Sequence, residues 1–349
     1  MSDVETTEEH DSIAGIPAPV ATYALHGHLP QWRALVEAHQ SGRLHHAWLL
    51  QGPRGIGKAT AAFAFARRLL SLPDAAEDLG PGSDATDAVA RQIAGGSHPN
   101  LVHITRPVTD KGTGFKTQIT VEEIRKLNRF FRTTTSAKQW RVAIIDPADD
   151  MNRNAANALL KILEEPPERS IFLITNHMPG RLLPTIRSRC RVLRFDPLAA
   201  DEMAATLATM PLGLGEDEMK AAIGLSDGSV RTAVSLIASG GLELEVHLRR
   251  ILAASEPAWP DIHALADALT QKGRETAFEL TLAAAFKHLA EEAEARLAKG
   301  EVALASRQAA LWASENERLR EGLAYNLDRK QMLLSFFDKL FALRSGRPG

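Results

Sequence analysis

Cysteine is almost absent from this sequence: Cys190 is the single one among 349 residues. A lone cysteine excludes an internal disulfide framework and any zinc site built on several cysteines. The loop-rich stretch 72–98, read as a surface insertion around one short helix, offers no metal-ligand spacing either. We therefore expect no zinc and no other dedicated metal cluster, and Cys190 itself is interpreted as a packing residue rather than a nucleophile.

Long apolar runs and a strong charge bias are also missing. No run reaches the roughly 18 residues that a membrane helix needs, and the acidic opening, residues 1–11, lacks the basic start of a secretion signal. The formal net charge of −2 argues against a wholly basic coat for nucleic acid, although a local basic face stays possible. These absences predict a cytoplasmic protein with no membrane partner, whose partners must be inferred from its motifs.

What is present predicts several domains. A chain of 349 residues with 44% hydrophobic residues can bury a sizeable core. Residues 1–20 are acidic and poor in large apolar groups, which predicts a flexible tail. Residues 21–197 alternate short apolar strands with helices, which predicts an α/β domain with a parallel sheet covered on both faces. Residues 198–241 and 242–349 read as helices only, a small bundle followed by a C-terminal helical domain.

A glycine-rich segment follows the apolar run that ends at Leu50. It reads Gln51-Gly52-Pro53-Arg54-Gly55-Ile56-Gly57-Lys58-Ala59-Thr60. Glycines at this spacing let backbone N–H groups surround phosphate oxygens, and a lysine then reaches the outer phosphates. The position that needs a hydroxyl for Mg²⁺ holds Ala59, and the side chain of Thr60 points roughly 100° away on the following helix. The segment from Gly52 to Thr60 therefore predicts a loop that binds ATP or ADP with weak Mg²⁺ handling; the alternative is a loop that stays empty.

A carboxylate follows a second buried strand. Residues 140–146 form an apolar run that ends at Asp146, and a carboxylate in this place can hold Mg²⁺ through water. An ATPase of this kind needs a neighbouring acid to orient the attacking water, but the next residue is Pro147. Asp149 and Asp150 lie beyond the strand and are interpreted as capping and solvated residues. The pattern predicts poor hydrolysis.

Three further motifs carry a family resemblance. They are the run Asn157-Ala158-Leu159-Leu160-Lys161-Ile162-Leu163-Glu164-Glu165-Pro166-Pro167, then Phe172-Leu173-Ile174-Thr175-Asn176, then Pro184-Thr185-Ile186-Arg187-Ser188-Arg189-Cys190. With these motifs, the chain resembles the AAA+ subunits of DNA clamp loaders from about residue 20 to 240. The resemblance implies an AAA+ P-loop domain, a helical lid domain and an all-helical C-terminal collar domain that joins subunits.

The resemblance also implies roles for three residues. Arg189 corresponds to an arginine finger that acts in trans on ATP held by a neighbouring subunit, and Asn176 to a polar residue that senses the γ-phosphate. Arg231, in Gly228-Ser229-Val230-Arg231, corresponds to a second sensor on the lid. Without the family context, Arg189 and Arg231 would each read as surface arginines.

The function implied is that of a finger donor rather than a motor. The expected assembly is a hetero-oligomer with ATPase and clamp-opening subunits that loads a sliding clamp on primed DNA. One alternative is a motor subunit that hydrolyses ATP with Thr60 and Asp149 in unusual positions. Another is a DNA-binding protein of the helicase-loader type, which predicts tight, salt-dependent DNA binding by the isolated chain.

Overall fold

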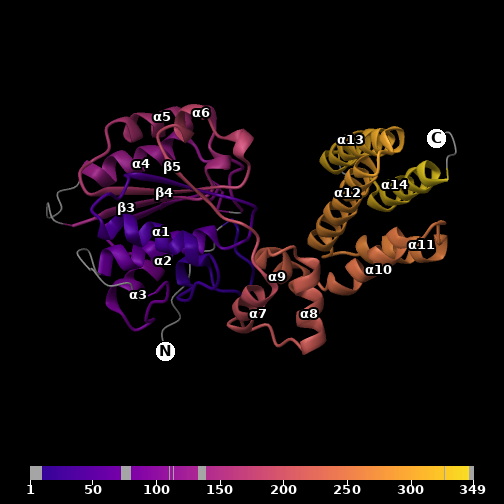
Figure 1. Cartoon of the computed structure of the whole chain (residues 1–349), viewed down its shortest axis with the longest axis horizontal. Helices are drawn as coiled ribbons and strands as arrows, with labels where there is room; N and C mark the ends of the chain where they lie inside the picture. The colour runs from indigo at the N-terminus through magenta and orange to yellow at the C-terminus, as the bar shows by residue number, and fades with distance from the viewer. Residues whose placement is uncertain are drawn as a thin grey trace. The chain divides into compact units, whose positions relative to one another are not determined.

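The structure is a computed structural model that describes residues 10–71, 80–109, 111–112, 114–132, 139–325 and 327–345. Residues 1–9 of the expected tail and 72–79 of the expected insertion lie outside the described residues. The chain divides into two compact units (Figure 1). The first extends to Gly213 and includes Ser226–Arg231, and the second comprises Leu214–Leu225 and the residues from Thr232 onward.

The first unit holds the strands and the helices that cover them. The strands are β1 (Ala47–Gln51), β2 (Leu101–Ile104), β3 (Arg141–Ile145), β4 (Ser170–Asn176) and β5 (Arg191–Arg194). The α-helices are α1 (Leu29–Gln40), α2 (Lys58–Ser71), α3 (Ala88–Ala94), α4 (Val121–Arg132), α5 (Arg153–Glu164), α6 (Pro184–Arg187) and α7 (Ala200–Ala208). Short 3₁₀ helices are η1 (Pro19–Ala21), η2 (Ala148–Asp150) and η3 (Pro179–Arg181).

The five strands form one parallel sheet in the order β2-β3-β4-β1-β5. The parallel sheet predicted from the alternation of strands and helices is thereby confirmed. Strand β1 lies between β4 and β5, and its last residue, Gln51, is paired in register with Asn176, the last residue of β4. Because the strands are parallel, the chain segments that leave β1 and β4 emerge side by side at one edge of the sheet.

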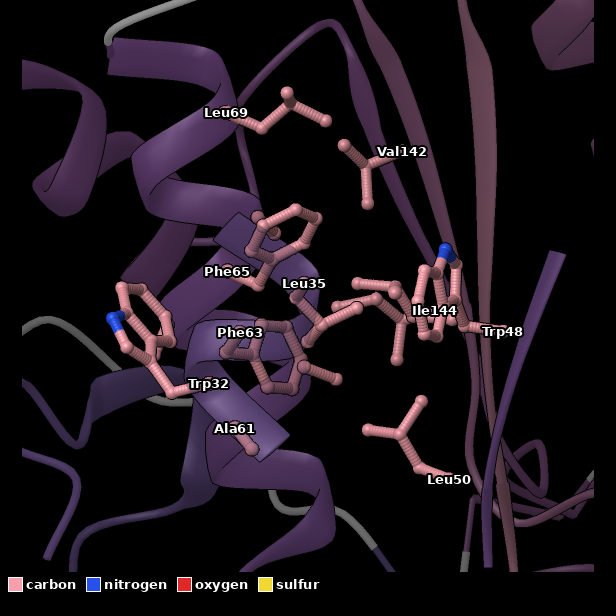
Figure 2. Close-up of a cluster of buried hydrophobic side chains, with 14 of the residues drawn as sticks. Trp32, Leu35, Trp48, Leu50, Ala61, Phe63, Phe65, Leu69, Val142 and Ile144 are labelled. Carbon is pink, nitrogen blue, oxygen red and sulfur yellow. The ribbon is translucent and has the colours of Figure 1, made fainter. Parts of the chain in front are cut away.

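The sheet is buried on both faces because side chains alternate along each strand. Trp48 and Leu50 join a cluster with α1 and α2, whereas Ala47 and Leu49 join a cluster with α4 and α5. Figure 1 shows α1, α2 and α3 on one side of the sheet and α4, α5 and α6 on the other. In Figure 2, Phe63 and Phe65 of α2 are drawn among the side chains of the first cluster. Burying one such aromatic side chain stabilises the fold by about 1.5–3 kcal/mol, so α2 is held firmly against the sheet.

The second unit is helical throughout its described residues, as the sequence predicted. Its helices are α8 (Glu216–Leu225), most of α9 (Val230–Ala238), α10 (Leu242–Ala253), α11 (Trp259–Leu269), α12 (Glu275–Ala298), α13 (Val302–Ala324) and α14 (Arg329–Arg344). Helices α10 to α14 share a core with several buried phenylalanines, among them Phe278, Phe336 and Phe337. The division of residues 198–349 into a lid domain and a C-terminal domain at residue 241 stays a prediction. None of the described helices is both long enough and apolar enough to cross a bilayer.

Candidate functional site: a phosphate loop and its neighbours

The glycine-rich segment is a tight loop between β1 and α2, which is the strand, loop and helix order that the motif requires. Gly55 has φ +80° and Gly57 has φ +100°, values that residues with a Cβ rarely adopt. At Gly52 a Cβ would stand 2.1 Å from the backbone oxygen of Phe195. Glycine is therefore needed at all three positions, twice for backbone freedom and once for space.

Lys58 is the first residue of α2, and its side chain is 3% exposed. Its Nζ donates to the carbonyl oxygen of Gly52 at 2.8 Å and also to that of Pro53. Burial lowers the pKa of Lys58 to about 8, although the nearby carboxylates of Asp146 and Asp149 act to raise it. A buried ammonium held by neutral oxygens keeps its positive charge, so it can attract a phosphate at this loop.

The residues that follow Lys58 have little to offer a metal ion. Ala59 and Thr60 lie in the first turn of α2, both partly buried. Ala59 carries no oxygen atom. Thr60 is two residues beyond Lys58, and such positions face different directions on a helix. Weak Mg²⁺ handling stays a prediction of the sequence.

The carboxylate predicted at the end of β3 is engaged with the neighbouring strand. Thr175 in β4 donates its hydroxyl to Oδ1 of Asp146. Asp150, four residues further on, accepts two hydrogen bonds from the guanidinium of Arg106, at 2.5 and 2.7 Å. Asp150 thus forms an ion pair that joins two segments of the fold, where the sequence suggested a solvated cap.

Asp149 is held even more completely. Its Oδ1 accepts from Nδ2 of Asn176 at 2.8 Å and from the backbone N–H of Met178 at 2.7 Å, and its Oδ2 accepts from the backbone N–H of His177 at 2.7 Å. Three donors from consecutive residues fix the turn that follows β4. The carboxylate of Asp149 is therefore part of the framework of the site.

Asn176 connects this turn to the phosphate loop. Its side chain is fully buried, and its Oδ1 accepts from Nε2 of Gln51 at 2.9 Å. Its backbone oxygen accepts from the N–H of Gly52 at 3.1 Å. The structure thus brings the predicted sensor residue to the loop, with its amide groups already hydrogen-bonded to Gln51 and Asp149.

Arg231 also reaches the loop, from the start of α9. Its backbone N–H donates to the oxygen of Gly55 at 3.2 Å, and Oγ of Ser229 donates to the oxygen of Arg54 at 3.1 Å. A Cβ on Gly55 would stand 2.4 Å from the Cβ of Arg231. This close backbone approach places a second guanidinium beside that of Arg54.

Three site residues were missed by the sequence analysis: Arg54, His177 and Asp11. Asp11 pairs with Arg54 and lies with its Oδ1 3.4 Å from Nη2 of Arg231. Burial lowers the pKa of His177 to about 3, with further lowering by the charges of Lys58 and Arg54. No local sequence signal marks Asp11, since it belongs to the segment predicted to be a flexible tail. The described part of that segment instead makes specific contacts, because Asp11 pairs with Arg54 and Arg231, which are distant in the sequence.

Arg189 belongs to a different set of contacts, between α5 and α6. Its Nη2 lies 2.8 Å from Oε1 of Glu164, and its Nη1 donates to the oxygen of Thr185 at 3.0 Å. The side chain is 36% exposed. The next residue, Cys190, has a thiol whose pKa burial raises to about 12, so it is a poor nucleophile, in agreement with a packing role.

The sheet order, the glycine-rich loop after β1, the polar residue at the end of β4 and the arginine at the start of α9 are those expected of the AAA+ P-loop domain that the sequence resembles. Residues 27–199 match the family model described as "DNA polymerase III, delta subunit". Residues 27–199 therefore resemble the clamp-loader subunits of DNA polymerase III, as the sequence predicted.

Several curated proteins are similar to part of the chain. DNA polymerase III subunit delta' of Pseudomonas aeruginosa is 36% identical over 214 residues, 60% of this chain and 61% of the relative. Subunit delta' of Escherichia coli K12 is 31% identical over 233 residues, 66% of this chain and 65% of the relative. Subunit tau of Bacillus subtilis is 31% identical over 199 residues, 56% of this chain and 33% of the relative. The chain thus matches less than two thirds of the length of each of these relatives.

Proposed function

We propose that this chain serves as a delta-prime-type subunit of a DNA polymerase III clamp loader. In this role it presents Arg189 to ATP held by a neighbouring subunit and hydrolyses little or no ATP itself. Its partners are the ATPase and clamp-opening subunits of a hetero-oligomer that loads a sliding clamp on primed DNA. The match of residues 27–199 to the family model and the similarity of the chain to curated delta' subunits support this assignment.

The observation that carries the proposal is the engagement of Asp149. A motor subunit would need a carboxylate to orient the attacking water, and Pro147 cannot serve. Asp149 is the candidate replacement, but the turn after β4 holds it with three hydrogen bonds of 2.7–2.8 Å. Freeing it would break three hydrogen bonds to a charged acceptor, each of which contributes about 1.5–3 kcal/mol. The carboxylate therefore stabilises the turn and does not activate water.

The contacts of Arg189 suit a residue that is delivered to a partner. The guanidinium and its carboxylate partner, Glu164, are 36% and 49% exposed, respectively. Exposed ion pairs contribute only about 0.2–1 kcal/mol, so Arg189 can exchange Glu164 for a phosphate at little cost. A guanidinium placed on the γ-phosphate stabilises the charge that develops in the transition state and raises turnover typically by about 10³ to 10⁵.

The test uses the clamp loader reconstituted from this chain and its partner subunits. We expect Arg189→Ala to leave assembly intact and to lower ATP turnover at the partner site that it faces. Arg187→Ala is the matched control, because Arg187 is an exposed arginine at the end of α6, two residues before Arg189. Equal turnover in the complexes that carry Arg189→Ala and Arg187→Ala would refute the finger assignment.

The isolated chain separates this proposal from its alternatives. We expect its Mg²⁺-dependent ATP hydrolysis to stay at background, with no further loss in Lys58→Ala. Robust hydrolysis that Lys58→Ala abolishes would identify a motor subunit instead. Tight DNA binding by the isolated chain, weakening steeply with salt, would favour the helicase-loader type.

A further inference from the structure

Asp11 makes an unusual set of contacts at the phosphate loop. Its Oδ1 pairs with Nη2 of Arg54, and the same oxygen lies 3.4 Å from Nη2 of Arg231. The backbone oxygen of Asp11 accepts a further hydrogen bond from Nη1 of Arg231. Two guanidiniums, one from the loop and one from α9, thus converge on a single carboxylate.

The carboxylate is only partly shielded from water. The side chain of Asp11 is 31% exposed. Burial alone would raise its pKa, but Arg231 and Arg54 outweigh this effect and hold the pKa below its ordinary value, so the group is anionic at neutral pH. An anion held by two arginines at the mouth of a phosphate loop has the charge and the neighbours that a phosphate group would have there.

Two anchors keep the segment that carries Asp11 in place. On one side, Nδ1 of His10 is 3.0 Å from the hydroxyl of Thr105, and the imidazole is 7% exposed. On the other side, the buried guanidinium of Arg67 donates to the backbone oxygens of Val20 and Thr22, at 3.2 and 2.6 Å. The segment therefore lies across the first unit as a strap, with Asp11 near one end.

The loop side of the contact is equally well defined. Gly55 leaves room for Arg231 to approach, and the backbone N–H of Arg231 donates to its oxygen at 3.2 Å. His177 follows Asn176, whose backbone oxygen accepts from the N–H of Gly52, so His177 lies at the same edge of the sheet as the loop. Besides burial, the positive charges of Lys58, Arg54 and Arg231 lower the pKa of His177, and the negative charge of Asp11 acts in the opposite direction.

We propose that Asp11 is an internal substitute for phosphate: its carboxylate pairs with Arg54 and Arg231, and a nucleoside triphosphate must displace it to bind at the loop. The strap then regulates occupancy of this site, independently of whether Arg189 acts on a neighbour. No covalent bond is made or broken, because the phosphate groups replace the carboxylate as the anion that pairs with the two guanidiniums.

The experiment measures binding of ATP and of inorganic tripolyphosphate to the isolated full-length chain without Mg²⁺, by calorimetry. Asp11→Asn keeps the shape of the side chain and removes its charge, and Asp11→Ala removes both. The control is Asp201→Asn, which changes an exposed carboxylate of α7 in the same unit. Thermal melting verifies that each variant is folded.

We expect both Asp11 variants to bind ATP and tripolyphosphate about tenfold more tightly than the unaltered chain, a change of about 1.4 kcal/mol. Asp201→Asn should bind as the unaltered chain does. Unchanged affinity in the Asp11 variants would overturn the proposal, as would a gain for ATP without one for tripolyphosphate. Failure of every variant to bind either anion would overturn it as well, because no phosphate site would then exist to be regulated.

A second measurement follows the strap itself and leaves Asp11 intact. Ala14 is exposed, and Ala14→Cys provides a thiol for a fluorescent dye. Cys190 should not compete for the dye at neutral pH, since burial raises the pKa of its thiol to about 12. We expect ATP and tripolyphosphate to change the dye signal saturably as the strap leaves. Binding without any change in signal would show that the strap stays in place, contrary to the proposal. Since this readout concerns the loop alone, it stays separate from the test of Arg189.

Discussion

Buried charges serve different purposes in the two units. In the helical unit, the carboxylate of Glu315 is 1% exposed and accepts from Arg318 at 2.5 Å and from Lys339 at 2.7 Å. In the α/β unit, Lys58 is 3% exposed and its ammonium is held by carbonyl oxygens, including that of Gly52 at 2.8 Å. The negative charge of Glu315 is neutralised by cations within the fold. The ammonium of Lys58 donates to neutral carbonyl groups and keeps its positive charge.

This difference separates a structural network from a binding site. A buried carboxylate that pairs with two cations fixes how the helices pack, and its charge is already compensated without a ligand. A buried cation whose hydrogen bonds go to carbonyl oxygens, in a loop that needs three glycines, can gain free energy by binding an anion. Arg54 and Arg231 in the α/β unit are likewise cations that can bind an anion, and they bind the carboxylate of Asp11.

The largest expected effect tests whether the two units are independent. Phe65 lies in the core of the α/β unit and Phe336 in that of the helical unit, both fully buried. Phe65→Ala and Phe336→Ala should each cost about 3–5 kcal/mol, and hydrogen exchange should show the loss in the mutated unit alone. Leu304→Ala, at a side chain that is 41% exposed, is the control and should change little. Loss of protection in both units would mean that they unfold together.

A smaller effect is expected from the network in the helical unit. Glu315→Ala leaves two cations without their carboxylate and should lower the free energy of unfolding by about 3 kcal/mol, the lower end for breaking a buried pair, because both cations reach water. Glu317→Ala, at an exposed position of the same helix, should cost less than about 0.5 kcal/mol. Chemical denaturation measures both. ATP affinity should be the same in the two variants; a change in Glu315→Ala would contradict the separation of structural and binding charges.

Acid should destabilise the α/β unit first. Burial lowers the pKa of five of its histidines, namely His10, His28, His46, His98 and His177. A histidine with a folded pKa below its unfolded value near 6.5 binds more protons when unfolded, so stability is complete above pH 6.5 and falls as the pH falls below it. For His177, with a pKa of about 3, the loss reaches about 2 kcal/mol at pH 5.

The helical unit should resist this range of pH. Burial would raise the pKa of Glu292 and of Glu315, but their arginine and lysine partners lower both pKa values overall. Carboxylates of this kind lose their contribution only below their unfolded pKa near 4.5. Hydrogen exchange between pH 7 and 5 should therefore show loss of protection in the α/β unit and little in the helical unit. Equal loss of protection in both units would contradict this prediction. His177→Asn should make the α/β unit less sensitive to acid.

The smallest expected effect concerns Lys58. Its pKa of about 8 means that it loses its proton between pH 7 and 9 in the chain without ligand. A bound phosphate would favour the protonated form, so ATP affinity should be highest below pH 8 and fall about tenfold from pH 7 to 9. Calorimetry without Mg²⁺ at both pH values measures this change. Lys58→Met should bind ATP weakly, and its ATP affinity should change much less with pH. An equally steep change in this variant would mean that another group causes the pH dependence.

Local sequence patterns predicted the elements that carry the site. The buried strand before Gly52, the helix after it and the buried strand before Asp146 were predicted from local sequence patterns, and all three are present. These predictions succeed because strand and helix patterns depend on residues within a few positions of one another. Helix α1 (Leu29–Gln40) escaped prediction; its buried residues, such as Trp32 and Leu35, are interspersed with polar and charged ones.

The roles of Asp149 and Asp11 could not be predicted in the same way. Asp149 reads as a helix cap or a candidate base, and only the pairing of β3 with β4 brings it to the N–H groups of His177 and Met178. Asp11 is separated from Arg231 by more than two hundred positions. Contacts of this range depend on the whole arrangement of the sheet, which no window of sequence contains.

The sequence by itself determined the parallel sheet, the glycine-rich loop with Ala59 where a hydroxyl is needed, and the resemblance to clamp-loader subunits. The tertiary structure decided which charged groups are available to a ligand and which already have partners. Asp149 is hydrogen-bonded within a turn, Lys58 donates to carbonyl oxygens of the loop, and Asp11 pairs with two arginines. The physical reason is that the identity of a side chain sets what it can donate or accept, whereas its partners are set by segments that meet only after folding.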